Sequence, residues 1–297
     1  MSRRLTILGI WLVIAAALLI RAAGEPKNDF RFSIMGDRTG GHQDQIYGRV
    51  WREIDLLHPD FVINVGDTIE GGRNHATMEG EWRDLRPTWD RYKHYPLYFT
   101  PGNHDIWSNE SEAVYRQATG QSTYYSFNYQ DAHFTVLDNS RTIELSQEQL
   151  DFLDRDLTQN AERRPKFVFF HKPFWISAIR SGQPPAGLHA LVKKHNVDHV
   201  ISGHGHQFVR LPYDGVVYME VGSSGGRLGG LRRAEGFRQG WFYHHVMVRV
   251  QAGRASFTVK EIDGPMGEGR MFRAEDWDAN GPQFDAADPA LSDRPVG

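Results

Sequence analysis

Five short apolar runs in this chain each end in a polar cluster, four of which contain glycine, and this repeated pattern most constrains the fold. Helix-periodic stretches separate the runs, and apolar runs of roughly four to eight residues between turn signals are typical of buried strands. Each run precedes its polar cluster as follows: 30–35 before 36–41, 61–65 before 66–72, 97–100 before 101–105, 166–170 before 171–173, and 199–202 before 203–206. Hairpin-like pairs then follow at 207–221 and 243–262. We therefore predict an α/β domain with mixed sheets.

The polar clusters carry side chains that bind metal ions. These side chains are Asp37, Asp67, Asn103, His171, His204 and His206. Ligands of α/β proteins bind at the carboxyl ends of strands, so the side chains should meet at one rim if the strands share sheets. Carboxylate, amide oxygen and imidazole together suit Mn, Fe, Zn or a similar ion. Two ions that share a carboxylate can activate water and clamp a phosphoryl group.

Composition and missing motifs exclude several other chemistries. The 297 residues include no cysteine, which rules out disulfides, thiolate zinc sites, Fe–S clusters and a cysteine nucleophile. The sequence has no Gly-x-Ser-x-Gly elbow, no Walker loop and no dinucleotide fingerprint. A formal net charge of −3 argues against binding nucleic acid through the overall field.

The order of these motifs resembles the calcineurin-like metallophosphoesterase superfamily, in particular its purple acid phosphatase-like branch of exported bacterial type. The order is Asp, Gly-Asp, Gly-Asn-His-Asp, His and Gly-His-x-His, and the block at 102–105 is the most specific part. The resemblance covers residues 30–262 and implies a four-layer αββα sandwich with two mixed β-sheets. It also implies a phosphoesterase with two divalent or trivalent ions, such as Mn, Fe or Zn. A metal-bound hydroxide would attack phosphate mono- or diesters in line.

The resemblance assigns a metal site to each ligand candidate. Asp67 would bridge the two ions, and Asp37 and His206 would belong to one of them. The other ion would have three further ligands, which are Asn103, His171 and His204.

Three other residues receive catalytic roles. His104 would contact the phosphate or protonate the leaving oxygen as a general acid. Asp105 would orient His104, by analogy with other carboxylate–imidazole pairs. Arg38 would supply positive charge to the substrate phosphate.

The second metal site departs from the family pattern. Most relatives have a histidine two residues after the first aspartate, where this chain has Thr39. Purple acid phosphatases instead place a tyrosine three residues after the bridging aspartate, where this chain has Glu70. We expect Glu70 to replace the missing ligand, with His42 and His75 as weaker candidates. A weak or vacant second site is the alternative.

The first 24 residues predict export. Arginines at 3–4 precede an apolar run at 5–20, and small residues follow near Gly24, as in a secretory signal peptide. The alternative is an uncleaved anchor in the inner membrane. In both cases we expect residues 30–262 to form a phosphoesterase domain in the periplasm or outside the cell. Residues 264–297, rich in Gly, Pro and Asp, should form an irregular tail.

The expected partner is a small-molecule phosphate ester, with membrane contact only through an uncleaved N-terminal segment. Two alternatives remain for the function. One is a catalytically weak or inactive protein that binds metal or phosphate on the same scaffold, and the other is a nuclease. The bridging Asp67 and the block at 102–105 favour the esterase, and the lack of a basic stripe disfavours the nuclease.

Overall fold

The computed structural model describes residues 29–43, 45–72, 74–229 and 239–262, together with three short strands between 271 and 282. The predicted signal peptide or anchor at 1–24 lies outside these residues. The predicted tail at 264–297 contributes three short strands, β13 (Met271–Arg273), β14 (Trp277–Asp278) and β15 (Gly281–Pro282), and its other residues are not described. No helix in the described part of the chain is long and apolar enough to cross a membrane.

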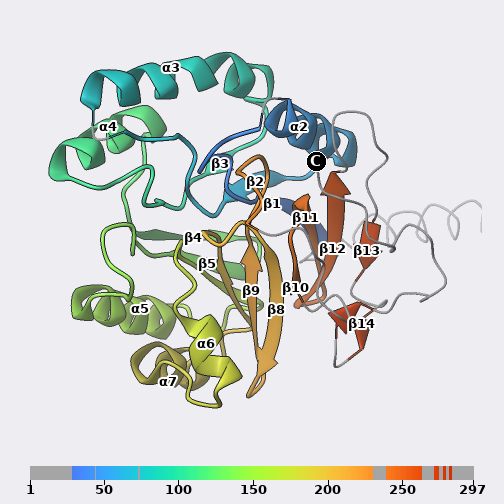
Figure 1. Ribbon diagram of the computed structural model, residues 1–297. Coiled ribbons are helices and arrows are strands. Elements are labelled where there is room, and N and C mark those ends of the chain that lie inside the picture. The colour runs from blue at the N-terminus through green and yellow to red at the C-terminus, as the bar shows by residue number, and fades with distance from the viewer. Residues whose placement is uncertain are drawn as a thin grey trace, which may run out of the picture.

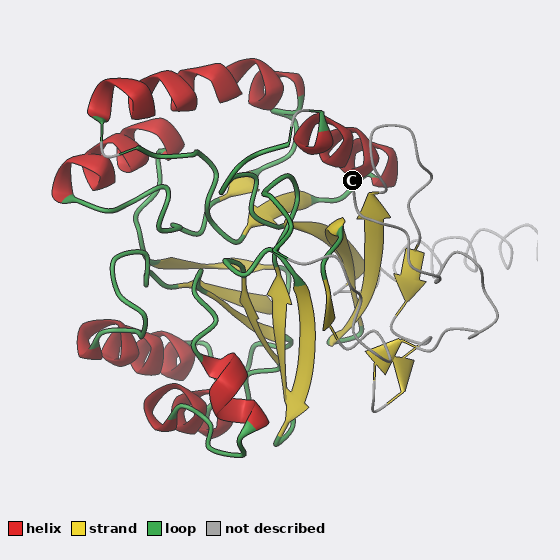
Figure 2. Cartoon of the chain, viewed as in Figure 1, coloured by secondary structure: helices red, strands yellow, loops and turns green. Residues whose placement is uncertain are grey.

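Two β-sheets lie face to face between two layers of helices (Figures 1 and 2). The helices of one outer layer are α2 (Ile46–Leu57), α3 (His75–Arg91) and α4 (Asn109–Thr119). Those of the other are α5 (Gln147–Gln159), α6 (Trp175–Arg180) and α7 (Ala186–Lys194). This arrangement confirms the predicted four-layer sandwich with two mixed sheets.

The first sheet has six strands in the order β13-β12-β11-β1-β2-β3. Besides β13, the strands are β1 (Asp29–Met35), β2 (Phe61–Asn64), β3 (Leu97–Tyr98), β11 (Tyr243–Gln251) and β12 (Arg254–Ile262). Strands β1, β2 and β3 are parallel, so the first three polar clusters of the sequence follow strand ends on one edge. Strand β11 lies antiparallel to β1 along its full length, from Asp29 opposite Gln251 to Met35 opposite His245.

The second sheet has seven strands in the order β10-β8-β9-β7-β6-β5-β4. Its bounds are β4 (Tyr125–Tyr129), β5 (Ala132–Val136), β6 (Lys166–Phe169), β7 (His199–Ser202), β8 (Phe208–Tyr213), β9 (Val216–Val221) and β10 (Gln239–Gly240). Strands β5, β6, β7 and β9 are parallel to one another. The last two polar clusters of the sequence therefore follow neighbouring strands, β6 and β7.

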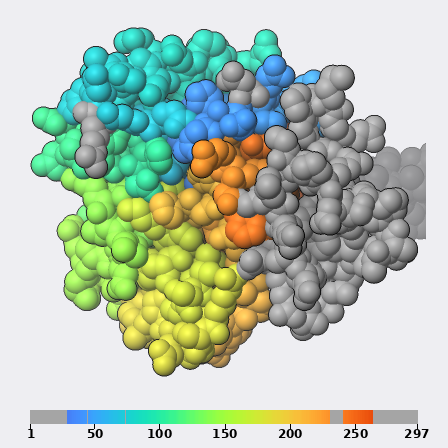
Figure 3. Space-filling view, in the orientation of Figure 1, coloured from blue at the N-terminus to red at the C-terminus, as the bar shows by residue number. Residues whose placement is uncertain are grey.

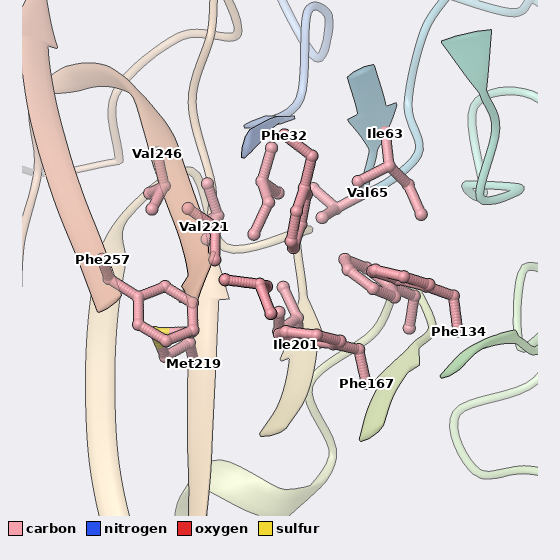
Figure 4. Packing of buried hydrophobic residues seen from close by; sticks show 14 of the residues in the cluster. Phe32, Ile63, Val65, Phe134, Phe167, Ile201, Met219, Val221, Val246 and Phe257 are labelled. Atoms are coloured by element: carbon pink, nitrogen blue, oxygen red, sulfur yellow. The ribbon is translucent and has the colours of Figure 1, made fainter. Parts of the chain in front are cut away.

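The facing surfaces of the two sheets form an aromatic core (Figure 4). Phe32 of β1 stacks on Phe61 of β2 at a ring separation of 5.0 Å. From the other sheet, Phe134 and Phe167 stack on each other at 4.9 Å and meet Phe32 edge-on. Burying each such side chain stabilises the fold by about 1.5–3 kcal/mol. This packing holds the strand ends of the two sheets next to each other.

Candidate metal centre

The structure brings the predicted metal ligands into two clusters that share one carboxylate. Asp67, His171 and His204 form one cluster, and Asp37, Asp67 and His206 form the other. Within each cluster the potential ligand atoms all lie within 4.8 Å of one another. Asp67 therefore occupies the position between two sites that the sequence predicts for a bridging ligand.

Each cluster takes its ligands from both sheets. Asp37 and Asp67 follow β1 and β2 of the first sheet, and His171, His204 and His206 follow β6 and β7 of the second. The space-filling view shows the blue residues from the early part of the chain lying next to orange residues from its later part (Figure 3). The site thus lies at the seam between the sheets.

The first cluster is held by well-oriented side chains. The Nε2 atom of His171 lies 3.1 Å from Oδ2 of Asp67, 3.2 Å from Oδ1 of Asn103 and 3.3 Å from Nδ1 of His204. The Nδ1–H of His171 donates to the Val65 carbonyl at 2.8 Å. Because Nδ1 is engaged by this carbonyl, Nε2 is the ring nitrogen that faces the cluster.

The second cluster has fewer candidate ligands, and a backbone carbonyl orients its histidine in the same way. His206 Nε2 lies 3.5 Å from Asp37 Oδ2, and its Nδ1–H donates to the Arg227 carbonyl at 2.6 Å. Asp37 Oδ2 also accepts the backbone N–H of His204 at 2.8 Å. Asp37 Oδ1 is buried and has no hydrogen-bond partner among the described residues. A buried carboxylate oxygen without a donor is free to bind a cation.

The charges at the site also suit cations. Burial, followed by the charge of Asp67, holds the pKa of Asp37 well above its ordinary value. Burial acts against ionisation of Asp67 as well, but the neighbouring His171 and His104 lower its pKa to about 2. Burial lowers the pKa of His204 to about 4 and also lowers that of His206, so both rings are neutral near pH 7. Neutral imidazoles beside buried carboxylates are good ligands for divalent transition metals.

Three ligand candidates sit in strained backbone. Asp67 (φ 51°), His204 (φ 81°) and His206 (φ 50°) all lie in the left-handed region, which non-glycine residues rarely occupy. Gly102 is required beside Asp67, since a Cβ atom there would lie 2.1 Å from the Asp67 nitrogen. Such strain persists where the surrounding structure enforces it and concentrates at functional sites.

His104 lies beside the clusters but belongs to neither. Its backbone N–H donates to Asp67 Oδ1 at 2.8 Å, and its Nδ1–H donates to the Glu70 carbonyl at 2.5 Å. We predicted that Asp105 orients this imidazole, but the partner of Nδ1 is the Glu70 backbone carbonyl.

Asp105 instead accepts hydrogen bonds from two loops that carry ligand candidates. Its Oδ1 accepts the backbone N–H groups of Thr68 and Ile69 at 2.8 and 3.2 Å, and its Oδ2 accepts that of Gly102 at 2.9 Å. Burial, followed by the charge of Asp67, raises the pKa of Asp105 to about 6. The carboxyl group thus joins the loop that carries Asp67 to the loop that carries Asn103.

Glu70 does not complete the second cluster. Its carboxylate accepts the backbone N–H groups of Gly41 and His42 at 3.1 and 2.7 Å and contacts Nδ1 of His42 at 2.9 Å. Partial burial alone would raise its pKa, but the Thr39 side chain and these N–H groups lower it to about 2. Glu70 is thus engaged outside the second cluster, and its role as the replacement ligand stays a prediction. The two weaker candidates also lie outside the second cluster. His42 pairs with Glu70, and His75 pairs with Glu110 on the surface.

Arg38 is held by protein groups. Its Nη1 donates to the Thr68 carbonyl at 3.0 Å, and its guanidinium lies over the Tyr47 ring at 5.5 Å. Neither contact involves a metal ligand, so its phosphate-binding role stays a prediction.

Sequence reasoning missed Asn139, a buried residue that follows β5. Its Oδ1 accepts the backbone N–H groups of His171 and Lys172 at 3.1 and 3.0 Å. Its Nδ2 donates to the carbonyls of Ile143 and Lys172, each at 2.9 Å. The amide therefore fixes the loop that carries His171. The only sequence signal is its place after an apolar run, because its partners are backbone groups.

The fold and the paired clusters define one class of protein: a four-layer sandwich whose strand ends carry two ligand groups that share one aspartate. The model of the calcineurin-like phosphoesterase family matches residues 30–208, and the chain belongs to this family. This membership confirms the predicted superfamily.

Known proteins of this kind resemble the chain over much of its length. Purple acid phosphatase 15 of Arabidopsis thaliana is 26% identical over 220 residues, which covers 58% of this chain and 41% of that protein. The structure of a purple acid phosphatase from yellow lupin (Lupinus luteus) aligns with a TM-score of 0.59 at 16% identity, covering 83% of this chain and 54% of that one. The chain thus spans about half or less of the length of these two relatives.

Two further structures share the fold. A dimetal phosphatase from Danio rerio aligns with a TM-score of 0.54 at 13% identity, covering 83% of this chain and 99% of that one. GAP50, described as the anchor in the inner membrane complex of Plasmodium, aligns with a TM-score of 0.59 at 16% identity, covering 79% of this chain and 85% of that one.

Proposed function

We propose that this protein is a metal-dependent phosphoric ester hydrolase that acts on a small-molecule phosphate monoester or diester. The observation that carries the proposal is the pair of ligand clusters sharing Asp67. The family of the chain and its similarity to purple acid phosphatases support the same reaction class.

Two ions fit the residues at the seam. Asp67, Asn103, His171 and His204 would hold one ion, and Asp37, Asp67 and His206 would hold the other. When bound, such ions supply Lewis acidity toward water and toward the phosphoryl group. Oxygen and imidazole nitrogen ligands of this kind suit Mn, Fe or Zn.

His104 is the group placed to move a proton. The Glu70 carbonyl accepts the Nδ1–H and so fixes the ring, which leaves Nε2 to take up and deliver a second proton. In its protonated form, Nε2–H can donate to a phosphate oxygen or to the leaving oxygen. The His104 backbone N–H, in turn, orients the shared Asp67.

The test is turnover of p-nitrophenyl phosphate and bis(p-nitrophenyl) phosphate after the metal-free protein is loaded with Mn²⁺, Fe²⁺ or Zn²⁺. We expect metal-dependent hydrolysis of at least one ester, and the preferred ester identifies a mono- or diesterase. Asp67→Asn should abolish the activity, whereas Asp84→Asn on the exposed surface of α3 should not. Absence of turnover with every metal and both esters would refute the proposal.

A second candidate function is metal or phosphate binding without turnover. The specific observation in its favour is the second cluster, where Glu70 is engaged elsewhere and only Asp37, Asp67 and His206 remain. The same assay separates the two functions, because a binder takes up metal in equilibrium dialysis but hydrolyses neither ester.

We also propose that the protein is exported, as the sequence pattern at 1–24 predicts. Cell fractionation followed by N-terminal sequencing tests this. A mature protein that begins near residue 25 indicates cleavage, and a membrane-bound chain with an intact N-terminus indicates an anchor. A full-length cytoplasmic protein would contradict export.

A further inference from the structure

The loop that carries His204 and His206 passes over the end of β9. In the second sheet β9 lies between β7 and β8 (Figure 1). The chain runs from the end of β7 to the start of β8 through the loop that contains residues 203–206. At this end of the sheet, Ser202 of β7 pairs with Glu220 of β9, and Phe208 of β8 pairs with Val221. The side chain of Glu220 is therefore well placed to support the loop.

This loop needs support because both of its histidines have left-handed backbone conformations. One contact comes from the first sheet, where Asp37 accepts the His204 backbone N–H. Another is the donation of the His206 ring to the Arg227 carbonyl. Neither contact reaches Gly205, the residue between the two histidines.

Glu220 fills that place. The side chain is fully buried, and its Oε2 accepts the side-chain N–H of Gln207 at 3.0 Å. The other carboxyl oxygen, Oε1, is buried and has no hydrogen-bond partner among the described residues. A Cβ atom on Gly205 would lie 2.2 Å from Oε1 and 3.1 Å from Gln207 Nε2, so these two side chains leave no room for a larger residue here.

We propose that Glu220 is a positioning residue that holds the loop 203–206 in its strained form and thereby sets both metal clusters. Glu220 belongs to neither cluster, but His204 belongs to one and His206 to the other. A single side chain below Gly205 thus controls one ligand of each site. The inference rests on the proposed metal-dependent function.

The first test compares Co²⁺ binding to the metal-free forms of wild type, Glu220→Ala and Glu220→Gln, followed by visible absorption. Glu220→Ala should weaken binding at both sites, by about 10–100-fold as is usual when a partner behind a metal ligand is lost. Glu220→Gln retains the shape and an acceptor for Gln207, so it should bind Co²⁺ like wild type. Tyr218→Phe is the matched control, since it removes a buried hydrogen bond to His189 from the same strand and should leave Co²⁺ binding unchanged.

The second test uses the close approach of Gly205. Gly205→Ala should weaken Co²⁺ binding in the wild-type background, because the new methyl group collides with Glu220. In the Glu220→Ala background the methyl group enters vacated space, so the double variant should bind Co²⁺ more tightly than the Gly205→Ala single variant. If Glu220→Ala alone does not fold, the Gly205→Ala single variant in the wild-type background decides the matter, because unchanged Co²⁺ binding there would overturn the inference.

The Co²⁺ binding results distinguish a failure of the proposed function from a failure of the role proposed for Glu220. If wild type binds no Co²⁺, the proposed function fails and the inference fails with it. If wild type binds two ions and Glu220→Ala binds them equally well, only the inference fails. Glu220→Gln binding as weakly as Glu220→Ala would also overturn it, because shape and hydrogen bonding would not then explain the effect.

Discussion

Acid should destabilise this protein through His245, a fully buried residue of β11. Its Nδ1 lies 3.1 Å from the Ser33 hydroxyl, and it pairs across the sheet with Lys260. Burial, together with the charges of His244 and Lys260, lowers its pKa from 6.5 to about 3. The native protein therefore keeps this ring neutral at a pH where the unfolded chain protonates it.

The sign and size of the effect follow from that difference. Between pH 6.5 and 3 the unfolded state binds one more proton at this site, so stability falls as the pH falls. The slope is about 1.4 kcal/mol per pH unit, which gives about 2 kcal/mol between pH 6.5 and 5 and about 5 kcal/mol in full. A domain of ordinary stability has about 5–15 kcal/mol in total.

Urea unfolding at pH 7, 6 and 5, followed by circular dichroism with a chelator present, measures this slope. His245→Gln has no ionisable ring, so its stability should fall less over this range, by about 2 kcal/mol relative to wild type. Ser33→Ala keeps the buried ring and should retain the wild-type slope. Parallel stability curves for wild type and His245→Gln would refute the reasoning.

Three further predictions concern the metal centre. Asp67→Asn should reduce metal content and turnover with little change in melting temperature, as metal analysis and calorimetry would show; an equal loss of stability would mark Asp67 as a structural turn residue. His104→Ala should keep its metal content but lose about 10²–10⁴-fold in turnover, and less for esters with good leaving groups; loss of a metal equivalent would make His104 a ligand. Glu70→Gln should bind Co²⁺ as tightly as wild type in a chelator competition, because its carboxylate contacts a loop; weaker binding at one site would restore Glu70 as a ligand.

The layers and the ligand set could be predicted because their signals are local. An apolar run that ends in a polar, metal-binding side chain marks a strand end, and Asp67 and His171 both follow such runs. The contacts of the Glu70 carboxylate could not be predicted, because its partners are the backbone N–H groups of Gly41 and His42 in the loop after another strand. The role of Asn139 could not be predicted for a related reason, because its side chain binds backbone groups, which every residue has.

The pairing of β11 with β1 has a consequence for how the protein acquires its metals. One of the two neighbours of β1, the strand that leads to Asp37, comes from residues 243–251, at the far end of the domain. During synthesis the chain emerges N-terminus first, so β1 waits for this partner until nearly the whole domain has been made. The carboxylate loop then reaches its final place only after translation of the domain is complete. We therefore expect the two metal sites to form only where the domain completes its folding.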